Sequence, residues 1–201
     1  MQVVLDWDGT VTEVDSLHLV LERFGDLGEY ERAEAQLGRS LTLHEVIAVE
    51  FRSVRAPLEE VVAWLLDTVR VRPGFRELAH AHRPVILSSG FRELIDPVLH
   101  REGIELEVLA NRVEERADGW RVHFRDEALC ATCGEACKRG SLLGEDVVYV
   151  GDGYSDRCAA LAAGRVFATA GLALYLDEQG VPYEPFTDLH EVARALDSPA
   201  R

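Results

Sequence analysis

The chain has 201 residues, of which 47% are hydrophobic, so it is long and apolar enough to fold around a core. Its 36 acidic and 21 basic side chains give a net charge of −15, which repels nucleic acids and anionic membranes and excludes both as expected partners. An anionic substrate would be repelled too. A phosphate site in this chain must therefore be local and must recruit a cation, such as a divalent metal.

No apolar stretch approaches the length of about 18 residues that a membrane helix needs, and the chain starts with strand-forming residues rather than with a basic, apolar leader. Three of the four cysteines lie together in CATCGEAC, a clustering that fits a reducing compartment. We therefore expect a cytoplasmic protein. A homodimer is left open, because the sequence does not bear on assembly.

The first predicted element is a short buried strand at residues 3–5, where VVL gives way to the polar DWDG turn. From residue 15 to residue 70 the pattern is helical. Apolar residues recur on one face, TLHE at 42–45 is a capping box, and Pro57 suits the first turn of a helix. This block interrupts a chain that otherwise alternates strands and helices, and its length predicts a small helical cap.

Strands and helices alternate from residue 75 onward, which favours a parallel sheet and the α/β fold class. An antiparallel hairpin is predicted over residues 112–124, with its turn at Asp118 and Gly119. The other predicted elements are helices at 75–82, 91–101, 155–163 and 188–196, and strands at 84–90, 103–111, 146–150 and 165–170.

Polar residues mark the ends of three of the predicted strands: DWDGT at 6–10, SSG at 88–90 and GDGYSD at 151–156. The carboxyl ends of parallel strands meet at one edge of a sheet, where ligands bind, so these loops are expected to share one site. Asp6 and Asp8 leave their strand on the same side because side chains alternate along a strand. Two carboxylates that face one phosphate would repel it unless a metal cation lay between them.

Aspartates in the first and third loops supply oxygen ligands, and a hard cation that accepts few carboxylates together with phosphate oxygens is Mg²⁺. The predicted metal ligands are Asp6, Asp8, Asp152 and Asp156. One aspartate of the first loop can attack phosphorus, while the other gives a proton to the leaving oxygen and later takes one from water. Hydroxyl and N–H groups at the strand ends, together with the only lysine of the chain, can hold the phosphoryl oxygens. The predicted phosphate-binding residues are Thr10, Ser88, Ser89, Gly90 and Lys138.

Each motif alone has an ordinary structural explanation, because an aspartate at a strand end often caps a helix or forms a turn. The occurrence in this order of DxDGT, a strand-terminal SSG, a lysine and GDGxxD favours a shared site. With these residues the chain resembles, along nearly its whole length, the haloacid dehalogenase superfamily of phosphohydrolases. The helical block between the first two motifs is similar to the small cap of its phosphoserine phosphatase-like branch.

The resemblance implies roles for the motif residues, with Mg²⁺ as the cofactor. Asp6 is expected to be the nucleophile, Asp8 the acid/base and Lys138 the lysine that offsets phosphate charge. Asp152 is expected to bind the metal directly, together with the main-chain carbonyl of Asp8, while Asp156 supports the metal through water or hydrogen bonds. Ser88 corresponds to the hydroxyl of the second motif.

The resemblance also implies the domain organisation. A Rossmann-like core with a parallel sheet is expected from residues 1–14 and 71–201. A small all-helical cap, inserted after the first strand, is expected from residues 15–70.

Within this branch, VRPGFREL and CATCGEACKRG look most like the 2-hydroxy-3-keto-5-methylthiopentenyl-1-phosphate phosphatases of methionine salvage, and phosphoserine phosphatases are the alternative. The latter grip their amino acid with a cap glutamate and a cap arginine. Asp15 stands near the first of these places, whereas Glu50 aligns near the second, with Arg52 close by in the sequence. Glu50 counts against phosphoserine. The predicted cap residues that contact substrate are Asp15 and Arg52.

The cysteine-rich segment permits two interpretations. Cys130, Cys133 and Cys137 could supply three corners of a zinc site, but no fourth ligand is evident and a single CxxC lacks the partner motif of a zinc ribbon. Reduced thiols that brace the loop before Lys138 are the favoured interpretation. Cys158 stands beside alanines on a predicted helix and is assigned to the core.

The sequence thus predicts a Mg²⁺-dependent phosphomonoester hydrolase that forms an aspartyl-phosphate. Its substrate is expected to be a small phosphorylated metabolite of the methionine-salvage or phosphoserine type. Two alternatives stay open: a phosphotransferase that passes the phosphoryl group to a small alcohol, and a phosphometabolite-binding protein without turnover.

Overall fold

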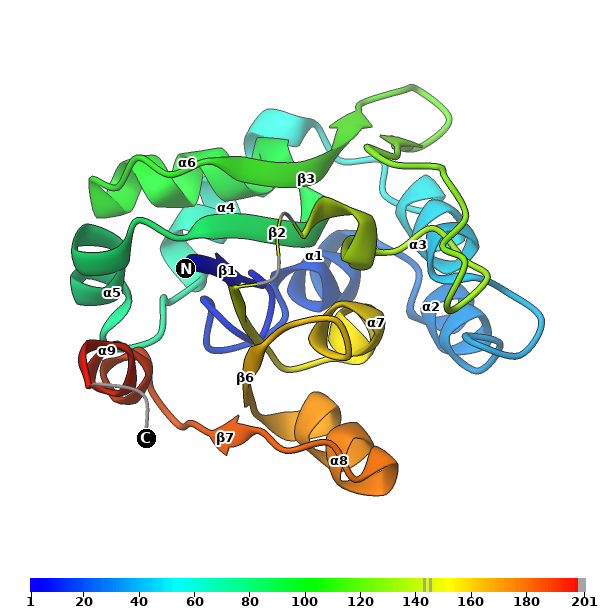
Figure 1. Cartoon of the computed structure of the whole chain (residues 1–201). Coiled ribbons are helices and arrows are strands. Elements are labelled where there is room, and N and C mark those ends of the chain that lie inside the picture. The colour runs from blue at the N-terminus through cyan, green and yellow to red at the C-terminus, as the bar shows by residue number, and fades with distance from the viewer. Residues whose placement is uncertain (143, 145, 199–201) are drawn as a thin grey trace.

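A seven-stranded sheet runs through the centre of the molecule in the computed structural model, which describes residues 1–142, 144 and 146–198 (Figure 1). The strand order is β4-β3-β2-β1-β5-β6-β7, and all neighbours are parallel except the antiparallel pair β3 and β4. The predicted α/β class with a mainly parallel sheet is confirmed. The strands are β1 (Gln2–Leu5), β2 (Val85–Phe91), β3 (Val108–Glu114), β4 (Arg121–His123), β5 (Val147–Gly151), β6 (Arg165–Ala168) and β7 (Glu184–Pro185).

Four helices fill the segment predicted as helical: α1 (Ser16–Phe24), α2 (Leu27–Glu34), α3 (Leu43–Arg52) and α4 (Leu58–Thr68). In Figure 1, α2 and α3 lie beyond the ends toward which the strands β1, β2 and β3 point, while α4 packs beside α6. The remaining helices are α5 (Phe75–His82), α6 (Arg92–Glu102), α7 (Arg157–Ala160), α8 (Ala170–Gln179) and α9 (Leu189–Asp197), with single 3₁₀ turns at Lys138–Ser141 and Tyr154–Asp156.

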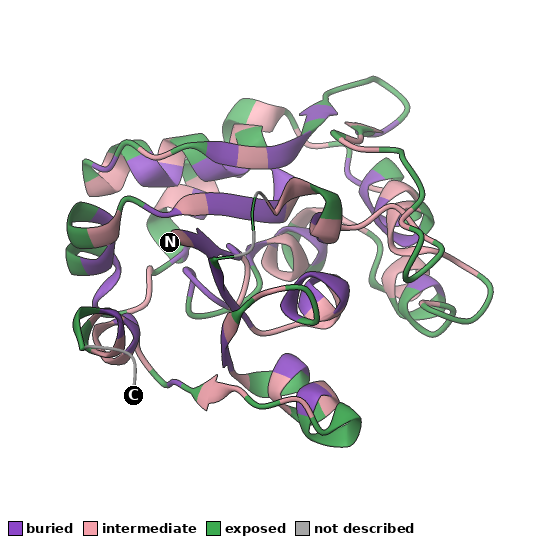
Figure 2. Ribbon diagram, in the orientation of Figure 1, coloured by how far each residue is buried: buried purple, intermediate pink, exposed green. Residues whose placement is uncertain are grey.

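One apolar cluster extends from the sheet into the helices of residues 15–70. The ring of Phe51 in α3 meets that of Phe91 edge-on, with 4.6 Å between the ring centroids, and the indole N–H of Trp120 donates to the carbonyl of Ala56 at 3.0 Å. Figure 2 shows the buried strands in the centre and the exposed outer faces of the helices. The division into a core (1–14, 71–201) and a cap (15–70) stays a prediction, because this cluster spans both parts.

Most helices and strands lie where short sequence patterns predicted them. The helix at 75–82, the helix that begins after Asp188 and the capping box of Thr42 and Glu45 all appear in the structure. Pro57 precedes α4 as its N-cap residue instead of standing in the first turn. No helix among the described residues is long and apolar enough to cross a membrane.

Three regions differ from the prediction, and one is the helix expected at 155–163, where only Arg157–Ala160 is α-helical after the 3₁₀ turn at Tyr154–Asp156. The strand expected at 103–111 begins only at Val108, where pairing with β2 starts, and it continues unbroken into the first arm of the hairpin. Helix α8 and strand β7 were not predicted. Only Leu172 and Leu176 of α8 are buried, while Leu174 is exposed, so its apolar residues show no clear helical stripe.

The capping box at the start of α3 offers a test of local stability. The backbone N–H of Glu45 donates to Oγ1 of Thr42 at 3.3 Å, and the N–H of Thr42 donates to the Glu45 carboxylate at 2.8 Å. Thr42→Ala should cost about 1 kcal/mol and lower the melting temperature by roughly 2–4 °C in a thermal unfolding scan. The matched control is Thr68→Ala at the exposed end of α4, and an equal loss in both variants would contradict the capping role.

Candidate active site

The loop after β1 aims its acidic side chains at the carboxyl edge of the sheet. The carbonyl of Trp7, a fully buried residue, accepts hydrogen bonds from three successive backbone N–H groups at 2.9–3.3 Å, so the chain reverses directly after the strand. Gly9 has φ +76°, and a Cβ there would lie 2.8 Å from Cγ of Asp152. Glycine at this position therefore serves both the turn and the close approach of the third loop.

Lys138 joins the first and third loops through buried ion pairs. Its Nζ donates to Oδ1 of Asp6 at 2.5 Å and to Oδ1 of Asp156 at 2.7 Å. The exposed fractions are 4% for Lys138, 4% for Asp6 and 0% for Asp156. Burial by itself would lower the pKa of Lys138, but the two carboxylates outweigh it and raise that pKa above its ordinary value. The lysine is therefore a fixed cation at the centre of the site.

Asp156 uses both of its carboxylate oxygens on protein donors. Oδ2 accepts from the N–H groups of Asp152 and Gly153, both at 2.9 Å, and Oδ1 accepts from Lys138 and from the hydroxyl of Tyr149, both at 2.7 Å. Four donors leave little of this carboxylate free for an ion. Asp156 thus positions Asp152 and Lys138 through hydrogen bonds, and its predicted support of a metal stays a prediction.

The carboxylates of Asp6 and Asp152, with that of Asp156 behind them, form an oxygen-only donor set. Oxygens of Asp6, Asp152 and Asp156 lie within 4.8 Å of one another, and Oγ1 of Thr10 donates to Asp152 at 2.9 Å. Burial raises the pKa of Asp6 well above its ordinary value, and burial raises that of Asp152 to about 6, with Asp156 adding to both. One lysine does not offset this negative charge. The donor set fits a hard divalent cation such as Mg²⁺.

Asp8 has its own partners on the other side of the first loop. Oδ1 accepts hydrogen bonds from the backbone N–H of Ser16 at 3.0 Å and from the Ser16 hydroxyl. Burial raises the pKa of Asp8 to about 7 and the nearby Asp15 adds to the rise, while Ser16 opposes it. A carboxyl group that titrates near neutral pH is suited to exchanging protons. This carboxylate lies outside the group formed by Asp6, Asp152 and Asp156.

The SSG segment, which the structure places within the last residues of β2, faces Asp8 across a short gap. A Cβ on Gly90 would lie 2.8 Å from Oδ2 of Asp8, so glycine is needed for this approach. The buried Ser88 accepts the N–H of Gly90 on its Oγ at 2.8 Å. The Asn111 side chain donates to the carbonyl of Ser89 at 2.7 Å and so ties this end of β2 to β3. The structure thus brings the predicted SSG segment beside the first loop.

Arg72 supports the first loop, and the sequence analysis did not identify it. Its guanidinium donates to the carbonyls of Gly9 at 2.6 Å, Thr10 at 2.9 Å and Thr187 at 2.9 Å. The planar guanidinium holds its N–H donors in a fixed geometry, and it thus joins three main-chain carbonyls from two distant segments. The only signal for it in the sequence was its place in VRPGFREL, and that stretch does not indicate which carbonyls it binds. Asn111 was also missed, because a single asparagine at the end of a predicted strand does not indicate which groups its side chain binds.

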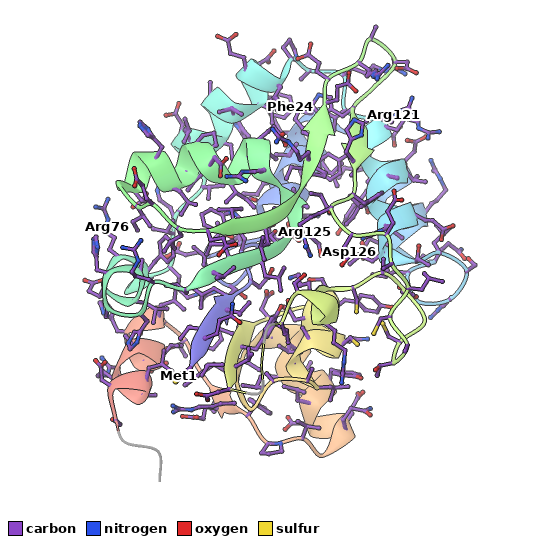
Figure 3. All side chains as sticks on the ribbon, turned by 45° about the horizontal axis from the view of Figure 1, so that its top comes forward. Met1, Phe24, Arg76, Arg121, Arg125 and Asp126 are labelled. Carbon is purple, nitrogen blue, oxygen red and sulfur yellow. The ribbon has the colours of Figure 1, made fainter. Side chains whose placement is uncertain are left out.

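Two adjoining cavities open at this edge of the sheet. The first, of about 210 Å³, contains Asp6 and Asp8 and is named here the acidic cavity. The second, of about 360 Å³, reaches from Lys138 past Arg125 and Arg157 to the cysteine-rich loop. Figure 3 labels Arg125 and Asp126 at the start of that loop. The two cavities share Leu43, Ser88, Ser89, Tyr154 and Ser155.

The structure separates the two predicted cap residues. Asp15 lines the acidic cavity and also caps α1, because its Oδ1 accepts from the N–H of His18 at 3.0 Å. Arg52 is exposed at the end of α3 and lines neither cavity. Glu50 on the same helix lines the acidic cavity instead, since it and Phe51 face inward. The acidic cavity therefore presents the carboxyl group of Glu50 and not the guanidinium of Arg52.

Glu50 is the most unusual group of the acidic cavity. It is 5% exposed, and its Oε1 has no hydrogen-bond partner among the described residues. Burial raises the pKa of Glu50 to about 8, and the carboxylates of Glu34 and Asp15 add to the rise. The His18 ring, which also lines the cavity, has an Nδ1 that is buried and unpartnered in the described part of the chain. Both groups are free to bind a polar ligand.

A known protein-family model matches most of the chain. The family model described as haloacid dehalogenase-like hydrolase matches residues 3–161. The chain belongs to this family. The interpretation drawn from the DxDGT, SSG and GDGxxD motifs is thereby confirmed, and the relatives named below are phosphatases.

Relatives match this family member along its whole length. The 2-hydroxy-3-keto-5-methylthiopentenyl-1-phosphate phosphatase of Bacillus mycoides (strain KBAB4) is 26% identical over 210 residues, which cover 98% of this chain and 95% of the relative. A substrate-bound phosphoserine phosphatase superposes with a TM-score of 0.72 at 18% identity, covering 96% of this chain and 97% of that one. A phosphoserine phosphatase with a phospho-aspartyl intermediate analogue gives a TM-score of 0.71 at 19% identity, with the same coverage. The solved structures establish the shared fold.

The raised pKa of Glu50 makes stability depend on pH. In the folded chain the Glu50 carboxyl group keeps its proton up to about pH 8, whereas in the unfolded chain it releases that proton near the ordinary pKa of 4.5. The free energy of unfolding therefore falls as the pH rises between these two values. Glu50→Gln removes this loss, and its melting temperature relative to wild type should rise between pH 5 and pH 8, by roughly 2–4 °C for each kcal/mol of stability that wild type loses. For the exposed control Glu60→Gln the difference should stay constant, and a constant difference for Glu50→Gln too would refute the assignment.

Proposed function

We propose that the chain is a Mg²⁺-dependent phosphomonoesterase that acts through an aspartyl-phosphate on Asp6. The observation that carries this proposal is the buried cluster in which Lys138 holds Asp6 against Asp156 while Asp8 lies apart with Ser16. One carboxylate is fixed beside a cation, and the other has a pKa near neutrality. A nucleophile and a proton carrier need these two different environments.

The side chains divide the reaction between them. Asp6 attacks phosphorus, and the bond from phosphorus to the ester oxygen breaks as Asp8 gives that oxygen its proton. The Asp8 carboxylate then takes a proton from water, the resulting hydroxide attacks phosphorus, and Asp6 is released with inorganic phosphate. Lys138 and the hydroxyl of Ser88 hold the phosphoryl oxygens as charge develops on them, whereas the buried Thr10 donates its hydroxyl to Asp152 and positions that carboxylate instead of binding phosphate as predicted.

A bound Mg²⁺ would offset the negative charge of phosphate and carboxylates and hold the phosphate beside Asp6. Asp6, Asp152 and the main-chain carbonyl of Asp8 are the residues proposed to hold it, with Asp156 behind them. The absence of any further lysine and the net charge of −15 support the need for such a cation.

The acidic cavity supports a leaving group that carries no carboxylate. Asp8, the proposed proton donor to the leaving oxygen, lines only this cavity, so the leaving group is placed there. Its walls combine Asp15, Glu34 and Glu50 with apolar residues, and they present no arginine or lysine that would pair with the carboxylate of phosphoserine. A protonated Glu50 can instead bond to a hydroxyl or keto oxygen. The apolar wall residues are Leu17, Leu21, Leu37, Leu43 and Ile47.

The name of the Bacillus relative describes a phosphate ester with hydroxyl, keto and methylthio groups. Those groups suit a cavity whose lining combines a protonated Glu50 with leucine side chains. We therefore propose a methionine-salvage type of substrate in preference to phosphoserine.

The reaction is tested by phosphate release from a panel of esters: phosphoserine, sugar phosphates, pyridoxal phosphate and methylthio-ketopentenyl phosphate analogues. Release should require Mg²⁺ and should fall at least about 1,000-fold in Asp6→Asn, because the nucleophile is lost. Asp67→Asn, a change at an exposed position of α4, is the matched control. Undiminished release by Asp6→Asn would disprove the mechanism.

Two other outcomes point to the alternative functions. Phosphoryl transfer to an added small alcohol at the expense of water would indicate a phosphotransferase. No release from any ester, by folded protein that still binds Mg²⁺, would indicate a binding protein without turnover.

Substrate choice is tested separately by reversing a charge in the acidic cavity. Glu50→Arg should raise kcat/KM for phosphoserine relative to a neutral ester at least about tenfold, which corresponds to about 1.4 kcal/mol, because a cation then faces the substrate carboxylate. The matched variant Arg52→Glu reverses a charge two positions away, outside both cavities, and should leave this ratio unchanged. The opposite pattern would restore Arg52 as the residue that reads the substrate.

A further inference from the structure

The four cysteines of the chain converge on one point beside the larger cavity. Cys130, Cys133 and Cys137 come from the loop between β4 and β5, and Cys158 comes from α7. One Sγ from each lies within 4.8 Å of the other three. Sequence analysis assigned Cys158 to the core and found no fourth partner for the other three. The fold supplies that partner.

The distances match those of a thiolate metal site. Sγ of Cys130 and Sγ of Cys158 are 3.8 Å apart, and all four cysteines are free. A tetrahedral zinc with Zn–S bonds of about 2.3 Å places its sulfurs about 3.8 Å from one another. Four sulfur donors with no oxygen donor among them favour a soft or borderline metal over Mg²⁺.

The backbone of the loop is already folded around one of the sulfurs. The N–H of Thr132 donates to Sγ of Cys130 at 3.4 Å, and the N–H of Gly134 donates to the Cys130 carbonyl at 2.8 Å. Gly134 has φ +77°, a conformation that glycine adopts without strain and that lets the loop return toward Cys137. Backbone N–H groups directed at sulfur stabilise a charged thiolate. Figure 3 shows yellow sulfur atoms in the loop that follows Asp126.

We propose that Cys130, Cys133, Cys137 and Cys158 bind one structural Zn²⁺. Four protein ligands complete a tetrahedron and leave no position for water, so the site is structural and takes no direct part in chemistry. Two arginines next to Cys158 carry charge opposite to that of the thiolates. Arg157 directly precedes Cys158, and Arg139 donates to the Cys158 carbonyl at 3.3 Å.

The position of the site gives it a consequence for the active site. Cys137 directly precedes Lys138, and Cys158 follows Asp156 by two residues. Zinc would therefore tie together the two backbone segments that carry the buried Lys138–Asp156 ion pair. The metal site itself is independent of the proposed phosphatase reaction. Only the link between zinc binding and the rate of phosphate release rests on the proposed function.

The test measures zinc and does not rely on activity. Protein produced with added zinc and purified under reducing conditions should contain about one zinc per chain by elemental analysis. Cobalt substituted for zinc should show the charge-transfer absorption of thiolate ligands. In competition with a chromogenic chelator, Cys158→Ser should bind zinc at least about 100-fold more weakly, since loss of even an outer-shell partner costs about 10–100-fold. If this variant does not fold, the exposed Cys133→Ser replaces it.

Asp152→Asn is the matched control, because it alters the oxygen site and leaves the thiols intact. The Asp152→Asn variant should bind zinc as the wild type does. Folded wild-type protein that takes up no zinc, or that shows by mass the loss of cysteine hydrogens to a disulfide, would overturn the proposal. Zinc bound equally well by Cys158→Ser and Cys133→Ser would overturn it too. A zinc-bound wild type that releases no phosphate would reject the proposed function and leave the zinc site standing.

Discussion

The structure depends on one buried ammonium group held between two buried carboxylates. Lys138 contacts Asp6 and Asp156 at 2.5 and 2.7 Å, and removing one member of such a set leaves an unpaired buried charge, at a cost of roughly 3–5 kcal/mol. The first loop, the segment after the cysteines and the third loop must therefore be in place together. Tyr149 completes the arrangement from the side, and Arg72 braces the first loop from outside.

This constraint also explains why similar aspartates do different things. Asp156 is saturated by four donors and acts on its neighbours, whereas Asp6 and Asp152 keep oxygens directed at a shared space. Asp8 is separated from them by the turn of the loop and titrates near neutral pH. Above the site, Glu50 extends the acidic character into the helices of residues 15–70. A strongly acidic chain thus favours a cation at the phosphate and a neutral leaving group.

Much of the fold was predictable because its signals are local. The apolar run before DWDGT, the capping box at Thr42 and the turn glycine of the hairpin each act within a few residues. Helix α8 was missed because its burial comes from packing on α7 and not from its own apolar stripe. The placement of Arg52 outside the cavities and of Glu50 inside them depends on how α3 is rotated against the sheet. Sequence spacing alone does not report that rotation.

The sequence by itself determined the α/β class, the order of the motifs and the residue types available for phosphate chemistry, because periodicity and turn chemistry are properties of neighbouring residues. Only the tertiary structure decided which side chains contact one another. Lys138 meets Asp6 across 132 positions, Thr10 meets Asp152 across 142, and Cys158 joins the other cysteines from a separate helix. Such contacts follow from the strand order, which places β5 beside β1, and a linear pattern does not encode that adjacency.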